Sequence, residues 1–354
     1  MKKILFVEST LFKSGPNNQL GYIIDNLKEY SYKILTFSNG DQLKGKNLFY
    51  LKIPQGIRGI FYLKYIKNFI ESCDHDLIHI NSSFRVLLFL NFLIKDKSKV
   101  LFVLRNDPSK VWGDKYPFFL SSILSKIYII ILKKINIVFC SKSLFEKYKT
   151  NFSQKKNCII QNSVNIIKNT SERKINTSKI KFLILSRLLK TKNIPFLIKT
   201  FKNDNFFSRH QLYIAGDGNQ KNKIIKMCQG ARNIFVKGHV HDVRKIFDET
   251  DILLSSSTTE GLPNSVLEAL SNNIPCILSD IDQHNEIYES VDSLKNLIFK
   301  NNESVELIKC VKYLIDNENE VRANMKKVIK NFSVEKMVTS YEDFYNKLCS
   351  NRNY

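Results

Sequence analysis

Two short stretches of this 354-residue chain carry the side chains best suited to chemistry. Glu260 and Glu268 flank the sequence Gly-Leu-Pro-Asn at 261–264, and Arg187 and Lys192 lie upstream. A guanidinium can grip a phosphate through two parallel hydrogen bonds, and an ammonium adds a mobile point charge. A carboxylate does not hold phosphate, but it accepts hydrogen bonds from hydroxyls. These residue types therefore predict a site for a ligand that carries both phosphate and sugar hydroxyls.

The stretch 251–268 is expected to build the phosphate site. The apolar run 252–254 ends in small polar residues, which is typical of a short buried strand. Gly261 then allows a tight loop, and Pro263 suits the first position of a helix. Strand, loop and helix N-terminus in this order favour an anion at the positive end of a helix dipole. An ordinary strand-to-helix turn with a capping acid and a solvated Glu has the same pattern.

One group of residues resembles the E-x7-E signature of retaining glycosyltransferases of family four: Glu260, Gly261, Leu262, Pro263, Asn264 and Glu268. In that family the first Glu contacts the transferred sugar, the following backbone amides hold the diphosphate, and the second Glu binds the ribose hydroxyls. The resemblance implies these three roles for Glu260, for residues 261–264 and for Glu268. It also implies the GT-B fold.

The upstream cations resemble the family's R-x4-K pair, which neutralises the leaving nucleoside diphosphate. Arg187 and Lys192 have this spacing, and Lys190 is a competitor for the lysine position. Three solvated cations are the alternative. Gly216 resembles the first glycine of the family's G-x-G turn, where a structural role is expected, and His239 lies where the family places the nucleobase.

The N-terminal half offers candidates for the acceptor side. Gly15 lies in a loop that lines the acceptor in the resembled family, although an ordinary turn glycine is equally compatible with the sequence. Family members often place a histidine after the fourth or fifth strand. Arg105, Asn106 and Asp107 occupy that place here, and His79, one strand earlier, is predicted to be a half-buried strand residue. This departure from the family pattern counts against a catalytic histidine.

The elements that must position these residues alternate between strand and helix, which predicts an α/β fold with parallel sheets. Strands are expected at 4–7, 32–37, 47–53, 77–80, 100–104, 135–140 and 158–161, and again at 180–185, 211–215, 233–237, 252–256, 274–278 and 297–299. The resemblance implies two Rossmann-like domains that face each other across a cleft. The predicted division is an acceptor-side domain at 1–163, a linker at 164–179, a nucleotide-sugar domain at 180–331, and a final helix within 332–354 that returns to the first domain.

The charge balance predicts anionic partners. Lys plus Arg number 55 against 33 Asp plus Glu, a net charge of +22. The segments 57–70 and 115–134 interleave lysines with aromatic and aliphatic residues, which suits contact with an anionic membrane surface. Core helices with solvated outer faces are the alternative. Because the lysines are spread over both halves and no nucleic-acid motif is present, a nucleic-acid partner is not expected.

Seven cysteines without a CxxC pair favour a reducing cytoplasm. The start of the chain is too short and polar for a signal peptide, and no segment reaches the roughly 18 apolar residues of a spanning helix. A cytoplasmic protein, peripheral on the inner face of the plasma membrane, is therefore expected. Asp280 and Asp282 form a D-x-D pattern, but the resemblance implies an Arg/Lys pair and a helix dipole in place of Mg²⁺, so neither metal nor cofactor is expected.

Taken together, the sequence predicts a metal-independent retaining glycosyltransferase. It would move a hexose-type sugar from a UDP- or GDP-sugar to a glycan or lipid-linked acceptor in bacterial surface polysaccharide synthesis. A nucleotide-sugar 2-epimerase of the same double-sheet architecture is the alternative, and a basic nucleic-acid-binding protein is a remote one.

Overall fold

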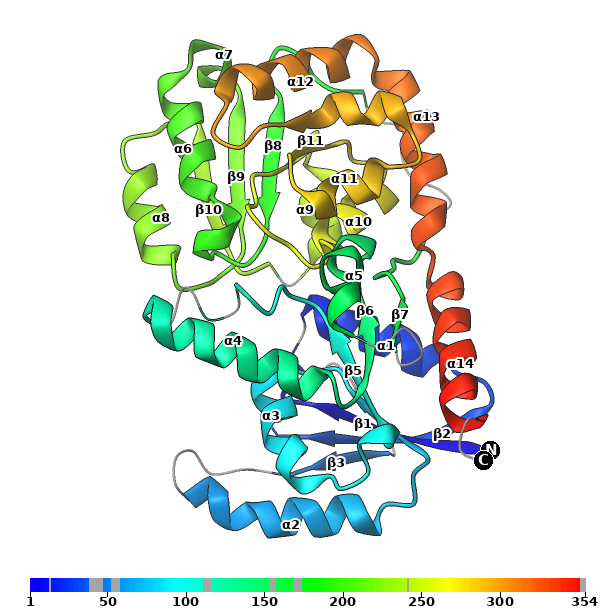
Figure 1. The fold of residues 1–354 in the computed structure, drawn as a ribbon. Coiled ribbons are helices and arrows are strands. Elements are labelled where there is room, and N and C mark those ends of the chain that lie inside the picture. The colour runs from blue at the N-terminus through cyan, green and yellow to red at the C-terminus, as the bar shows by residue number, and fades with distance from the viewer. Residues whose placement is uncertain are drawn as a thin grey trace. The chain divides into compact units, whose positions relative to one another are not determined.

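Parallel strands and helices alternate along the chain in the computed structural model (Figure 1). The structure describes residues 1–12, 14–37, 47–51, 58–110, 112, 116–152, 157–167, 174–240 and 242–350, without the side chains of 58–63 and 118. These residues form two units, Met1–Asn162 with Val334–Tyr354, and Ser163–Ser333. Each unit holds a parallel sheet, so the prediction of two parallel-sheet α/β domains is confirmed.

The sheet of the first unit has the strand order β3-β2-β1-β4-β5-β6-β7. Its strands are β1 (Lys2–Glu8), β2 (Tyr30–Thr36), β3 (Leu48–Tyr50), β4 (Leu77–Ile80), β5 (Val100–Leu104), β6 (Asn136–Phe139) and β7 (Asn157–Ile159). Its helices are α1 (Gly15–Asn26), α2 (Arg58–Ser72), α3 (Phe84–Leu93), α4 (Phe118–Leu132), α5 (Lys142–Tyr148) and α14 (Val334–Ser350). The strand order reverses between β1 and β4, and ligands of such sheets bind beside the carboxyl ends at that point.

Helix α14 packs on the first unit, although it is the last helix along the chain. It buries Tyr341 and Tyr345 with Phe6 and His79 of the sheet. His79 Nδ1 lies 2.6 Å from the Tyr345 hydroxyl, and burial lowers the pKa of His79 to about 3. His79 is therefore a neutral packing residue. The sequence predicts a half-buried strand residue; the structure confirms the strand but buries the side chain completely.

The sheet of the second unit has the order β10-β9-β8-β11-β12-β13. Its strands are β8 (Lys181–Leu185), β9 (Gln211–Ala215), β10 (Ile234–Gly238), β11 (Ile252–Ser255), β12 (Cys276–Ser279) and β13 (Ile298–Phe299). Its helices are α6 (Ile194–Asn203), α7 (Asn205–Ser208), α8 (Lys221–Cys228), α9 (Val243–Asp248), α10 (Asn264–Ser271), α11 (Asp282–Tyr288), α12 (Ser304–Asp316) and α13 (Glu318–Ile329). The order reverses between β8 and β11.

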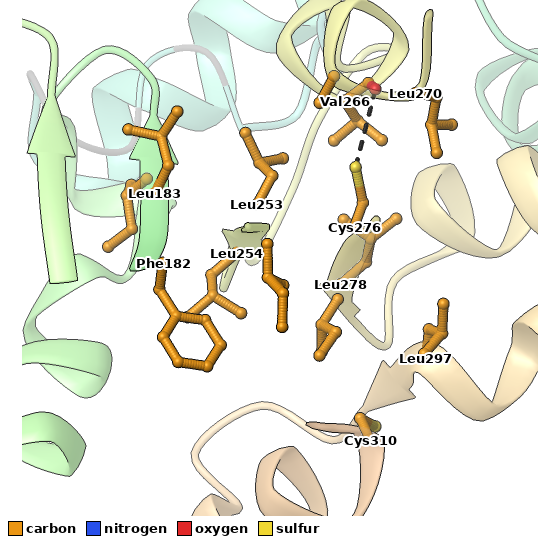
Figure 2. Close-up of a cluster of buried hydrophobic side chains, with 14 of the residues drawn as sticks. Phe182, Leu183, Leu253, Leu254, Val266, Leu270, Cys276, Leu278, Leu297 and Cys310 are labelled. Atoms are coloured by element: carbon orange, nitrogen blue, oxygen red, sulfur yellow. Dashed lines mark hydrogen bonds between the residues drawn. The ribbon is translucent and has the colours of Figure 1, made fainter. Parts of the chain in front are cut away.

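The central strands of this unit are apolar on both faces because helices cover both faces of a parallel sheet. Figure 2 shows Leu253 and Leu254 of β11 in the same buried cluster as Val266 and Leu270 of α10. The apolar face of α10 thereby fixes the helix against the sheet, and with it the position of the helix N-terminus.

Two details differ from the expectations. Pro263 is the N-cap of α10, not its first residue, and the helix begins at Asn264. The described part of the stretch 164–179 belongs to the second unit, since Val164 forms a β-bridge with Ser333 and Ile175 is buried in that unit's core. These apolar residues are isolated in a polar stretch, so periodicity does not mark them.

Candidate functional site

In the second unit, two loops meet where the strand order reverses. One follows β8 and the other follows β11, the neighbouring strand. The Thr258 amide donates to the Thr191 carbonyl at 2.8 Å, and Ser256 Oγ donates to the carbonyls of Lys192 (2.9 Å) and Asn193 (3.2 Å). These bonds join the two loops and hold the backbone of Lys192 in place.

The side chains of Lys192 and Glu260 form an ion pair across these loops. Lys192 Nζ donates to Glu260 Oε1 at 2.5 Å, and the two side chains are only 16% and 11% exposed. Ser257 Oγ donates to the same oxygen at 2.6 Å. Burial alone would raise the pKa of Glu260, but the charge of Lys192 and these hydrogen bonds hold it below its ordinary value. Glu260 is therefore ionised, and its charge is balanced by a cation at the rim of the sheet.

A polar pocket adjoins this pair and reaches the first turn of α10. Its polar lining is Ser186, Lys192, Ser255, Ser256, Ser257, Glu260 and Ser265. Ser186 Oγ is buried and has no hydrogen-bond partner among the described residues. Because α10 directs the positive end of its dipole to its N-terminus, the pocket combines a lysine, hydroxyls and a helix dipole, which suits an anionic group.

The loop between β11 and α10 is tightly packed. Gly261, Leu262 and Pro263 are buried, and the amide of Val266 donates to the Pro263 carbonyl at 3.1 Å. Asn264 begins the helix, and Glu268 lies one turn further along it, half-buried. The predicted phosphate-binding residues thus form one continuous turn beside the Lys192–Glu260 pair.

The other predicted residues of this unit lie at the same edge of the sheet. Arg187 and Lys190 are exposed in the loop after β8, and Lys192 is the lysine that reaches Glu260. Gly216 has a φ of 137°, and a Cβ there would lie 1.8 Å from the Ser186 carbonyl oxygen. Only glycine fits, so Gly216 shapes the loop that carries Arg187. His239 is exposed directly after β10.

A second polar cluster lies at the corresponding edge of the first unit. Glu8 ends β1, and its Oε2 accepts from Asn81 Nδ2 at 2.8 Å. Arg105 donates to Asn81 Oδ1 (2.5 Å) and to Asn162 Oδ1 (2.9 Å). Burial raises the pKa of Glu8 above its ordinary value. Gly15 begins α1 nearby in the fold, since the Pro16 carbonyl accepts from Asn81 Nδ2 at 3.2 Å.

Sequence reasoning missed several of these polar residues, namely Glu8, Ser257 and His284. Their positions in the sequence could have indicated them. Glu8 ends a strand, and Ser257 and His284 each follow a strand at the carboxyl edge of the sheet. Asp280 accepts from Asn285 Nδ2 at 2.7 Å, and the part of the chain that the structure describes contains no group of three His, Cys, Asp or Glu residues placed to hold a metal ion.

Helix α4 exposes an apolar stripe on the first unit. Its members are 38% to 76% exposed: Phe119, Leu120, Ile123, Ile127 and Ile130. Three exposed lysines, Lys126, Lys133 and Lys134, lie in or just after the same helix, which contains no acidic residue. None of the described helices is both long and apolar enough to span a membrane.

The predicted basic and apolar segment on α2 is different. Ile66 and Ile70 are buried in the core, whereas Lys64 and Tyr65 are exposed. The side chains of 57–63, and also Lys115 at the start of the other segment, lie outside the described residues. Of the two segments, only the one that includes α4 presents an extended apolar surface in its described part.

Comparison with known proteins finds similarity to glycosyltransferases. Residues 165–332 match the family of glycosyl transferases group 1. The O-antigen biosynthesis glycosyltransferase WclY of Escherichia coli is 24% identical over 372 residues, which cover 98% of each chain. An uncharacterized glycosyltransferase of Methanocaldococcus jannaschii is 27% identical over 62% of this chain, and the match spans only 58% of that relative's length. The crystal structure of HepE from Anabaena in complex with UDP-glucose has a TM-score of 0.74 at 13% identity, covering 99% of this chain and 100% of that one. This likeness shows that the chain has the fold of these GT-B enzymes.

Proposed function

We propose that the chain, whose residues 165–332 match the family of glycosyl transferases group 1, transfers a hexose-type sugar from a nucleotide sugar to a glycan or lipid-linked acceptor during bacterial surface polysaccharide synthesis. The observation that carries the proposal is the Lys192–Glu260 pair beside the N-terminus of α10. The similarity to WclY supports the biosynthetic role. The UDP-glucose bound to HepE supports a uridine nucleotide as the donor.

The site favours departure of a nucleoside diphosphate. Cleavage of the anomeric bond places negative charge on the β-phosphate, so cations and dipoles directed there stabilise the transition state more than the ground state. Lys192, Arg187 and the N-terminus of α10 supply that stabilisation. When the diphosphate draws Lys192 away, Glu260 becomes available to accept a hydroxyl of the donor sugar. Glu268 binds the ribose, and His239 lies beside the nucleobase.

The acceptor belongs to the first unit in this proposal. Glu8, Asn81 and Arg105 form a polar cluster at the carboxyl edge of that sheet, close in the fold to Gly15. Transfer proceeds with retention at the anomeric carbon, and the departing phosphate takes the acceptor proton. Proton NMR of the first product tests this, because an anomeric configuration opposite to that of the donor contradicts retention.

The transfer is metal-independent in this proposal, because lysine, arginine and a helix dipole already face the diphosphate. Turnover in excess EDTA should equal turnover in Mg²⁺. A loss of activity that Mg²⁺ restores would contradict this part of the proposal.

A panel of UDP-, GDP- and ADP-sugars tests the donor class by thermal shift. A bound ligand raises the melting temperature with the logarithm of its concentration above Kd. UDP-sugars are expected to give the largest shift. If none of the three classes shifts the melting temperature and no sugar is transferred, the proposed function is wrong.

The similar proteins described above are glycosyltransferases, which disfavours the 2-epimerase alternative. Incubation of a UDP-sugar without acceptor should therefore give no 2-epimer.

The same enzyme is proposed to work on an anionic membrane surface, at the cytoplasmic face. The apolar stripe of α4 can enter the interface while Lys126, Lys133 and Lys134 contact lipid phosphates. Wild-type protein should sediment with phosphatidylglycerol vesicles and far less with phosphatidylcholine vesicles. Ile123→Glu/Ile127→Glu should weaken that binding about tenfold or more, whereas Ile225→Glu, at an exposed apolar position of the second unit, should not. Equal binding by all three proteins would contradict a membrane role for α4.

A further inference from the structure

Phe12 is an exposed aromatic residue in the loop between β1 and α1, and the mechanism above does not use it. It is 61% exposed, whereas its neighbour Leu11 is completely buried. The strand order of the first sheet reverses between β1 and β4, and ligands of open α/β sheets bind beside the loops that follow the strands at such a point. The Ser9 amide donates to Ser82 Oγ at 3.1 Å, which joins these two loops. The topology therefore places Phe12 at the edge of this sheet where a ligand is expected.

Hydrogen bonds hold the backbone on both sides of the Phe12 ring. Asn17 is 2% exposed, and its Nδ2 donates to the carbonyls of Thr10 and Phe12, each at 2.7 Å. The Phe12 amide donates to Thr10 Oγ1 at 3.3 Å. Both hydrogens of a buried amide are thus used to keep this part of the loop in one conformation. Less conformational entropy is then lost when a ligand contacts the exposed ring.

The polar cluster of the first unit is bonded to both ends of the same loop. Asn81 Nδ2 donates to Glu8, which precedes the loop, and to the carbonyl of Pro16, which follows it. The cluster can bind hydroxyls, but a neutral pyranose also has a face made of C–H groups. Small-ligand sites combine a few placed polar groups with aromatic side chains, and the electron-rich face of an aromatic ring attracts C–H groups. Phe12 supplies the apolar surface that the polar cluster lacks.

We propose that Phe12 contacts the acceptor, with its ring packed against the C–H face of a neutral pyranose whose hydroxyls bind the cluster of Glu8, Asn81 and Arg105. This inference rests on the proposed function and names the chemical class of the acceptor unit. A single exposed aromatic residue is common on protein surfaces. Two observations set Phe12 apart, namely its loop at the reversal of strand order and the buried asparagine that holds its backbone.

Saturation-transfer difference NMR tests the contact. The probes are the methyl pyranosides of glucose, galactose and N-acetylglucosamine, each added to protein saturated with UDP. Irradiation of the aromatic protons of the wild-type protein should transfer saturation to the ring C–H protons of at least one probe. Phe12→Ala should weaken binding of that probe about fivefold, in the range of one aromatic contact. Phe12→Trp should retain the binding, because it keeps an aromatic face.

Phe92→Ala is the matched control. Phe92 is 79% exposed on α3 of the same unit, so its removal also deletes an exposed phenylalanine ring but leaves the loop unchanged. Both alanine variants should keep the melting temperature of the wild type, because exposed side chains contribute little to stability. Both should also bind UDP as the wild type does. Only Phe12→Ala should lose affinity for the pyranoside.

The outcomes separate the inference from the proposed function. Equal pyranoside binding by the wild type and Phe12→Ala would overturn the inference, as would equal losses in Phe12→Ala and Phe92→Ala. A wild-type protein that is stabilised by a UDP-sugar but transfers no saturation to any of the probes would overturn it as well. If Phe12→Ala does not fold, Phe12→Leu, which lacks an aromatic ring, gives the same comparison. A protein that neither binds a UDP-sugar nor transfers its sugar would refute the proposed function itself.

Discussion

Each unit carries a carboxylate beside the point where its strand order reverses, but the two carboxylates have opposite electrostatics. Glu8 at the edge of the first sheet accepts from the Ser9 amide (2.7 Å), from Ser9 Oγ (3.0 Å) and from Asn81 Nδ2 (2.8 Å), all neutral groups. Burial raises its pKa. Glu260 in the second unit faces the ammonium of Lys192, and its pKa is lowered.

The difference indicates which kind of ligand each edge suits. Arg105, the cation of the first cluster, bonds to two asparagine side chains, whereas Lys192 bonds to a carboxylate from a flexible stem. A lysine that can exchange a carboxylate for a phosphate suits an anionic donor. A cluster of amides and a carboxyl without a paired cation suits a neutral ligand rich in hydroxyls. The comparison therefore supports donor binding in the second unit and acceptor binding in the first.

Removing the mobile cation should have the largest effect. Lys192→Ala is expected to lower kcat by about 10²–10³-fold, the usual cost of one donor to a developing negative charge. The melting temperature should also fall, because Glu260 is left buried without its partner. Glu260→Gln in the same background should recover stability but not turnover, as measured by thermal unfolding and by a donor-turnover assay.

Lys190→Ala is the matched control for Lys192→Ala. Lys190 is exposed two positions away in the same loop, so its removal should change turnover less than about threefold, the range of a surface charge. Equal losses in the two variants would mean that general positive charge, and not the Lys192 contact, serves the donor.

A change in the polar cluster of the first unit should affect acceptor-dependent turnover and not the binding of UDP. Glu8→Gln places an amide NH₂ against the donors of Ser9 and Asn81, so the cluster must rearrange. Acceptor-dependent turnover is expected to fall about tenfold, the cost of one disturbed hydrogen bond, while the Kd for UDP stays unchanged. Glu29→Gln, at an exposed position of the same unit, serves as the control. A weakened UDP affinity in Glu8→Gln would contradict the division of roles.

Stability toward acid tests the two units apart from catalysis, and both units contribute. Burial lowers the pKa of His79 to about 3 and the pKa values of His210 and His284 to about 4. A histidine with a lowered pKa stabilises the folded state fully above about pH 6.5, and this contribution is lost as the pH falls toward 4.

Urea unfolding at several pH values measures this effect. Unfolding should take up about three protons near pH 5 from the histidines, so the free energy of unfolding should fall steadily between pH 6.5 and 5. Glu8 acts in the opposite direction, because a carboxyl with a raised pKa gains stability as the pH falls, but it is a single group. A free energy of unfolding that stays constant over this range would contradict the burial of neutral histidines.

The sequence predicts the sheet strands and the strand, loop and helix around Gly261 well, because both leave local signals. The apolar run of β11, Gly261 and the apolar face of α10 each follow directly from residue type and spacing. The choice between Lys190 and Lys192 does not follow from residue type and spacing. It depends on the 3₁₀ turn Lys190–Lys192 and on Asn193, whose φ of 48° redirects the chain into α6.

Contacts between distant segments also leave no local signal. His284 contacts Ser255 at the end of β11, 29 positions earlier in the chain, and in the sequence it stands only two positions after an apparent D-x-D pattern. The role of the stretch 164–179 depends on Val164, which pairs with Ser333 far along the chain. Periodicity describes one element at a time, so it cannot predict such pairings.

A crystal structure with UDP bound tests the central claim most directly. The account predicts that the β-phosphate lies at the N-terminus of α10, with Lys192 Nζ at a hydrogen-bond distance of about 3 Å from a phosphate oxygen and withdrawn from Glu260. UDP bound elsewhere on the second unit, with the Lys192–Glu260 pair intact, would contradict it.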